Sequence, residues 1–217
     1  MKASSLLIVL FLFIEQSFSQ TDLGLWSGIA IEKEISKKFE FEVGEELRLK
    51  NNITQVNSLL TELGFTYKAN KFYRLGLGYR FTYYTNGSFG NRLTLSNQVR
   101  YKIEDITLSY RLNVQQDFST KDPIEYKIRN KISIDYKINK HWEIGTAGEL
   151  FYSFYFNRNV LDRYRLSFGV DHSFNKRHKL GASIRFQQEI NAANAESDVI
   201  LGVKYKYSMK ARKKDKA

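Results

Sequence analysis

The chain has 217 residues, a formal net charge of +11 and no cysteine, which excludes a disulfide-stapled secreted domain and a lipid anchor on an N-terminal cysteine. After the N-terminal segment, no stretch approaches the roughly 18 consecutive apolar residues of a membrane helix. A membrane location therefore requires a closed β-barrel, the other architecture that satisfies backbone polar groups in lipid.

The N-terminus predicts export. Lys2 precedes an unbroken apolar run at residues 6–14, and Ser17 and Ser19 have the spacing of a cleavage site. The run is too short to span a bilayer. We therefore expect residues 1–19 to be a secretory signal peptide. Export argues against nucleic acid as a partner, despite the basic composition.

Eleven segments of the mature chain alternate with period two between apolar and polar side chains, the pattern of strands with two unlike faces. Short turns follow the odd segments and longer polar loops follow the even ones, an asymmetry typical of outer-membrane barrels with periplasmic short turns. In chain order the segments are 24–34, 38–50, 56–69, 71–85, 91–103, 105–117, 124–138, 141–155, 159–174, 178–190 and 196–208.

The segment at 124–138 indicates which face meets lipid. Its even positions are Ile and Tyr except for Asn130, whereas its odd positions carry charges such as Arg129 and Lys131. A Lys or Arg turned to lipid costs about 2–4 kcal/mol near the midplane, so the odd face must line the lumen. Applied to the other segments, this choice predicts a charged lumen wall of Glu42, Glu46, Arg48, Glu62, Arg74, Arg80, Arg100, Arg111, Arg129, Glu149, Arg165, Asp171, Arg185 and Glu189.

The strand count is odd, whereas single-chain bacterial barrels usually have an even number. We expect about ten strands, with residues 23–34 forming a special first segment instead of a full membrane strand. Twelve strands, with two merged in the segmentation, is the alternative. The predicted fold is an all-β, antiparallel up-and-down transmembrane β-barrel.

The end of the chain favours insertion into the outer membrane. Gly202 is followed by aromatic residues at Tyr205 and Tyr207, which is similar to the C-terminal signal of outer-membrane barrels, although ten residues follow Tyr207. The expected partners are outer-membrane lipid and, through these three residues, the barrel assembly machinery.

No catalytic or metal-binding constellation is evident. The histidines at 141, 172 and 178 lie in basic turns or near a strand end, and none has metal-ligand spacing to another histidine. We expect no catalytic residue, no metal and no cofactor.

Several motifs in order resemble an uncharacterised bacterial family, domain of unknown function 2490, found in Bacteroidetes. They are Asp22-Leu-Gly-Leu-Trp26, Glu45-Glu-Leu-Arg48, Thr61-Glu-Leu-Gly64 with Tyr67-Lys68, and Gly76-Leu-Gly-Tyr-Arg80. The resemblance covers the mature chain, implies an outer-membrane barrel and assigns no activity. It suggests a lumen cluster of Trp26, Glu46, Arg48, Glu62 and Arg80, to which we add the lumen-facing Arg74.

The sequence thus predicts a signal peptide at 1–19, one barrel domain at 20–209 and a basic tail at 210–217. The expected protein is a small, monomeric outer-membrane barrel of unassigned role with a lumen occluded by charged side chains. Three alternatives stay open: a soluble, lipocalin-like periplasmic barrel that binds an apolar ligand, a narrow anion-preferring pore, and a lipid-modifying barrel enzyme.

Overall fold

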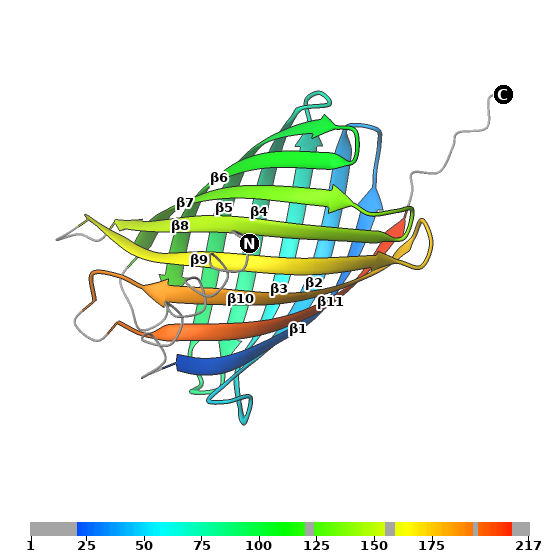
Figure 1. The fold of residues 1–217 in the computed structure, drawn as a ribbon. Coiled ribbons are helices and arrows are strands. Elements are labelled where there is room, and N and C mark those ends of the chain that lie inside the picture. The colour runs from blue at the N-terminus through cyan, green and yellow to red at the C-terminus, as the bar shows by residue number, and fades with distance from the viewer. Residues whose placement is uncertain (1–20, 120–123, 155–158, 193–194, 210–217) are drawn as a thin grey trace, which may run out of the picture.

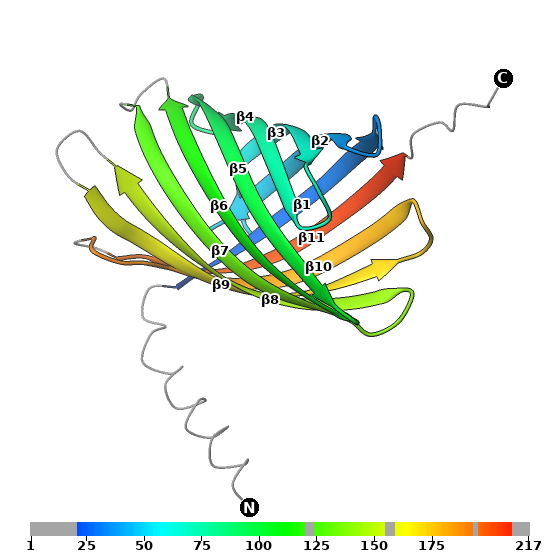
Figure 2. The same cartoon turned by 90° about the horizontal axis from the view of Figure 1, so that it is seen from above.

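The protein is a single closed β-barrel of eleven strands in the computed structural model (Figures 1 and 2). Consecutive strands pair antiparallel around the barrel, so the predicted all-β, up-and-down fold is confirmed. The predicted segments match the observed strands to within three residues. The strands are β1 (Thr21–Glu34), β2 (Phe39–Lys50), β3 (Gln55–Lys68), β4 (Tyr73–Tyr84), β5 (Phe89–Ile103), β6 (Ile106–Ser119), β7 (Glu125–Lys137), β8 (Trp142–Phe154), β9 (Asn159–Ser173), β10 (His178–Glu189) and β11 (Ser197–Met209).

The structure describes residues 21–119, 124–154, 159–192 and 195–209. The expected signal peptide and basic tail lie outside these residues. Within them, no helix has the length and apolar character needed to cross a membrane.

Alternation along each strand separates an apolar outer face from a polar inner one, because successive side chains point to opposite sides of a sheet. On β7, Ile132 and Ile134 are 63% and 47% exposed on the outside. Arg129, between the apolar positions, forms an inner ion pair with Glu149 of β8. The assignment of the charged face of 124–138 to the lumen is therefore confirmed.

The turns at one end share a local design. Asn and Ser favour turns because their side-chain oxygens accept hydrogen bonds from nearby backbone N–H groups. Asn70 Oδ1 accepts from the backbone of Phe72 and Tyr73, both at 2.8 Å. The same pattern recurs at Ser36, Asn139 and Asn175.

The two ends differ less in loop length than the sequence suggested. Counted between strand bounds, the turns after the odd-numbered strands contain two to four residues. The loops after the even-numbered strands, at the other end, contain four to seven. We call these the short-turn end and the long-loop end. The expected asymmetry is present and modest.

The barrel closes through a parallel pair, β1 with β11, which lie side by side in Figures 1 and 2. β1 has fourteen residues and also pairs antiparallel with β2. The expectation that residues 23–34 are not a full strand is therefore wrong, and the count is eleven instead of ten. In an up-and-down barrel with an odd number of strands, the first and last strands run in the same direction. Closure must then be parallel.

Candidate functional site

Several cavities lie within the lumen. A cavity of about 910 Å³ lies at the long-loop end and another of about 510 Å³ lies beyond it toward the short-turn end. Both are lined by the same four side chains from β4, β5, β6 and β7, which therefore lie at their common border. We call these side chains the partition: Arg80, Arg92, Gln115 and Arg129.

Ion pairs with neighbouring strands hold the partition arginines. Each arginine lies on the inner face and meets a carboxylate on the adjacent strand, so charge-assisted hydrogen bonds fix its guanidinium group. The pairs are Arg80 Nε with Glu62 Oε1 at 2.6 Å, Arg92 Nη2 with Asp117 Oδ2 at 2.7 Å and Arg129 Nη2 with Glu149 Oε1 at 2.7 Å.

Trp26 forms a second lumen feature beside the closing seam. The guanidinium carbon of Arg48 lies 3.8 Å from the indole centroid, and those of Arg185 and Arg165 lie at 4.9 and 5.2 Å. The aromatic face attracts these cations through its quadrupole. Gly202, the register partner of Trp26, leaves room for this arrangement: a Cβ there would lie 3.1 Å from Arg185 Nη2.

The structure brings five of the six predicted cluster residues into two adjoining groups. Trp26 and Arg48 are register partners, and Arg48 Nη2 lies 2.7 Å from Glu46 Oε1. Glu62 and Arg80 are register partners on β3 and β4.

Arg74 lies apart from these groups. It faces Lys68 near the short-turn end of β3 and β4, and it lines cavities that Trp26 and Arg48 do not reach. Sharing an inner face with Arg80 therefore does not make it a neighbour, because the two residues lie six positions apart along one strand.

Asp22 has a structural role that sequence reasoning missed. Its carboxylate accepts hydrogen bonds from the backbone N–H groups of Asn51 and Asn52 at 2.9 and 2.8 Å. Asn51, Asn52 and Ile53 all have positive φ, which is rare outside glycine and strained for a β-branched residue. Asp22 thus fixes the β2–β3 loop against the start of β1. The sequence did point to this residue, because Asp22 is the first residue of the motif that ends at Trp26.

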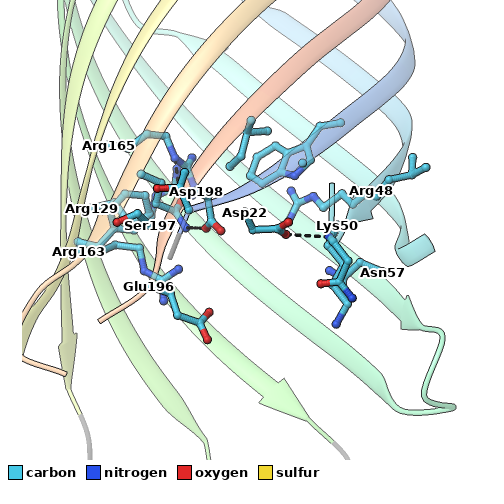
Figure 3. Close-up of a pocket in the computed structure, with 18 of the residues that line it drawn as sticks. Asp22, Arg48, Lys50, Asn57, Arg129, Arg163, Arg165, Glu196, Ser197 and Asp198 are labelled. Atoms are coloured by element: carbon cyan, nitrogen blue, oxygen red, sulfur yellow. Dashed lines mark hydrogen bonds between the residues drawn. The ribbon is translucent and has the colours of Figure 1, made fainter. Parts of the chain in front are cut away.

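The cavity at the long-loop end is predominantly basic. Eight cationic side chains line it against three acidic ones. In Figure 3, Asp22 and Asp198 lie between two groups of basic side chains contributed by strands on either side. These groups are Arg48 and Lys50 from β2, and Arg129, Arg163 and Arg165 from β7 and β9.

The histidines lie away from these lumen features. His172 packs on Trp142 of the outer face, with ring centroids 4.4 Å apart, and His178 contacts Tyr205 at the short-turn end. Among the described residues, no group of three or more His, Cys, Asp or Glu side chains is arranged to hold a metal ion. The chemistry that the lumen offers is the binding of anions by guanidinium and ammonium groups.

Comparisons with known proteins agree with this architecture. A solved structure described as "Bacterial polysaccharide outer membrane secretin" superposes with a TM-score of 0.55 at 12% sequence identity. The alignment covers 76% of this chain and 63% of the other, so the chain spans less than two thirds of that protein. The likeness concerns the fold alone. No match was found among curated proteins.

A family model with the description "Protein of unknown function (DUF2490)" matches residues 23–198. The match begins in β1 and ends at the second residue of β11, so it includes the partition and Trp26 but leaves most of the β11 side of the parallel seam outside. The resemblance seen in the ordered motifs is thereby confirmed, and the chain belongs to the DUF2490 family.

Proposed function

We propose that the protein is an integral outer-membrane β-barrel whose lumen is closed by the partition. The observation that carries the proposal is the apolar outer surface on all sides of the barrel. Ile29 of β1, Leu77 of β4, Ile132 of β7 and Leu166 of β9 are each 55–63% exposed. Soluble monomers rarely expose apolar surface on this scale, whereas lipid would cover it at no cost.

Polar groups on the outer face support the same environment. Three outer asparagines each accept a hydrogen bond from a tyrosine hydroxyl on the neighbouring strand, which reduces the cost of placing an amide in lipid. The tyrosine lies two residues before the asparagine's register partner in all three cases. The pairs are Tyr73 with Asn97 at 2.7 Å, Tyr79 with Asn91 at 2.6 Å and Tyr110 with Asn130 at 2.7 Å.

The character of the interior argues against a soluble carrier of apolar ligands. A lipocalin-like barrel needs apolar side chains inside, and here the described cavities are lined mainly by charged and polar groups. The solved neighbour is described as an outer-membrane secretin, which agrees with the proposed location.

A narrow anion-preferring pore is the second candidate. It is favoured by the excess of cations around the cavity at the long-loop end and by the partition side chains, each of which borders both cavities. The ion pairs of the partition support closure instead, because a conducting path would require these groups to separate.

Cell fractionation and gel migration test the membrane location. We expect the protein in the outer-membrane fraction, resistant to carbonate extraction, and migrating faster on gels before boiling than after. Release by carbonate wash alone would contradict the proposal.

Planar-bilayer recording tests closure. We expect no steady conductance from the wild type, and conductance from the double variant Arg80→Ala/Arg129→Ala, which removes two partition arginines from β4 and β7. Lys140→Ala, an exposed turn position, is the matched control and should stay silent. Steady anion-selective conductance of the wild type would contradict closure and support the anion-preferring pore.

A further inference from the structure

A third cavity, of about 500 Å³, occupies the short-turn end of the lumen on the side of β4 to β11. We call it the short-turn chamber. Seven cationic side chains line it against three acidic ones. Two of the cations are already paired, Lys179 with Asp171 and Glu143, and Lys206 with Glu32 and Glu42.

The other five cations lack a carboxylate partner. Within the part of the chain that the structure describes, no Asp or Glu oxygen lies within 4.0 Å of any of them. They come from five different strands and line one cavity, so their positive potentials add. They are Arg74, Arg100, Arg111, Lys131 and Arg185.

The acids near these five cations do not balance their charge. Glu149 is the register partner of Lys131 on β8 but binds Arg129 at 2.7 Å and Arg165 at 3.5 Å. Asp135 lies against the wall at Gly145, where an added Cβ would overlap its Oδ1. One unpaired acid therefore faces five unpaired cations.

Two of the cations oppose each other directly. Arg111 and Lys131 are register partners on the inner face of β6 and β7, and like charges in that position destabilise a sheet. Such a cost is offset when an anion binds between them. Four serine hydroxyls also line the chamber and supply further hydrogen-bond donors: Ser109, Ser133, Ser167 and Ser183.

We propose that the short-turn chamber binds a small multivalent oxyanion, of the phosphate or polycarboxylate class, between Arg111, Lys131 and the surrounding arginines. Guanidinium forks match such oxyanions geometrically, and the volume suits a ligand of metabolite size. The side from which the anion enters rests on the proposed membrane location: with the short turns toward the periplasm, as the loop lengths predict, the chamber lies toward the periplasm.

Titration calorimetry and thermal unfolding of the purified, detergent-solubilised barrel test the site, at constant ionic strength. The probes are inorganic pyrophosphate and citrate. We expect saturable binding of at least one probe and a higher Tm in its presence. The variant Arg111→Gln/Lys131→Gln should weaken binding by about tenfold or more. Without ligand it should unfold at a higher temperature than the wild type, because the like-charge pair is gone.

The matched control is Lys37→Gln/Lys140→Gln, which removes two positive charges from exposed turns at the same end. It should bind the probe as the wild type does. Equal losses in both variants would indicate general electrostatic attraction and overturn the site, as would no saturable binding of either probe to the wild type.

The relative response to the two probes assigns the ligand class. Pyrophosphate alone indicates a phosphate site, and citrate alone a carboxylate site. These outcomes are separate from the tests of the proposed function. If the barrel conducts ions but binds the probe, the anion site is supported and the proposed closure is contradicted. If it lies in the outer membrane, does not conduct and does not bind either probe, only the anion site is contradicted.

Discussion

Two neighbouring glutamates on β2 face opposite environments. Glu46 points into the lumen and binds Arg48, whereas Glu45 lies on the outer face near the middle of the strand, between its register partners Ile29 and Thr61. In the proposed membrane location, a carboxylate facing lipid at this height would cost free energy, though less than the roughly 2–4 kcal/mol of a Lys or Arg. The same substitution should therefore have opposite effects at the two positions.

We expect Glu45→Gln to raise the free energy of unfolding in lipid vesicles by about 1 kcal/mol. Glu46→Gln should lower it by about 1–3 kcal/mol, because Arg48 loses a charged hydrogen-bond partner. Urea unfolding of the barrel in vesicles, followed by gel migration, measures both. Each variant is the control for the other, and effects of the same sign would contradict the assignment of faces.

At the scale of elements, the parallel seam is reinforced by ion pairs that pass over β1. Lys206 of β11 reaches Glu42 of β2 at 2.6 Å, and Lys204 reaches the same carboxylate at 3.2 Å. The side chains on the inner face of β1 are small here, at Gly28 and at Ala30, which is 2% exposed. The long side chains of Lys204 and Lys206 can therefore cross β1. These contacts tie three strands together at the only parallel junction among the described strands.

We expect Glu42→Gln to loosen this junction and cost about 1–2 kcal/mol, a value reduced by the partial exposure of the three side chains. Hydrogen exchange read by mass spectrometry should show faster exchange in β1 and β11. Glu40→Gln, which breaks a contact with Lys68 of β3, is the control and should affect β2 and β3 instead. The same exchange pattern in both variants would argue against a role of Glu42 in closure.

The elements themselves could be predicted from sequence because alternation and turn chemistry are local. The charges on 124–138 identified the inner face, and breaks between the predicted segments fall at turns that the structure shows Asn70 and Asn139 capping. The closing partner of β1 could not be predicted in this way, because a register between the two ends of the chain leaves no local pattern.

The lumen cluster was predictable only where the residues are register partners or, as with Glu46 and Arg48, lie two positions apart on one strand. Trp26 and Arg48 meet across one strand pair, as do Glu62 and Arg80. Arg74 shares their inner face but lies toward the short-turn end. The alternation of a strand predicts which face a side chain is on, but not which other residues lie at the same level along the barrel. Asp22 was missed because its partners are backbone N–H groups of a loop 29 and 30 residues away.

For the whole molecule, an odd strand count places the two ends of the barrel wall on opposite sides. β1 begins at the long-loop end with Thr21, and β11 ends at the short-turn end with Met209. With the short turns toward the periplasm, as the loop lengths predict, Thr21 would face the cell exterior and Met209 the periplasm. An even-stranded barrel would instead have both on one side.

Epitope tags test this topology on intact cells. A tag inserted before Thr21 should bind antibody without permeabilisation, whereas a tag after Ala217 should bind only after the outer membrane is opened. Tags in the 85–88 loop and in the two-residue turn at 104–105 are the matched controls for the two ends. If the tags before Thr21 and after Ala217 reacted on the same side, the parallel closure of β1 with β11 would be contradicted. If both ends were reversed together with their controls, the barrel would stand and only its orientation would change, placing the short-turn chamber at the cell surface.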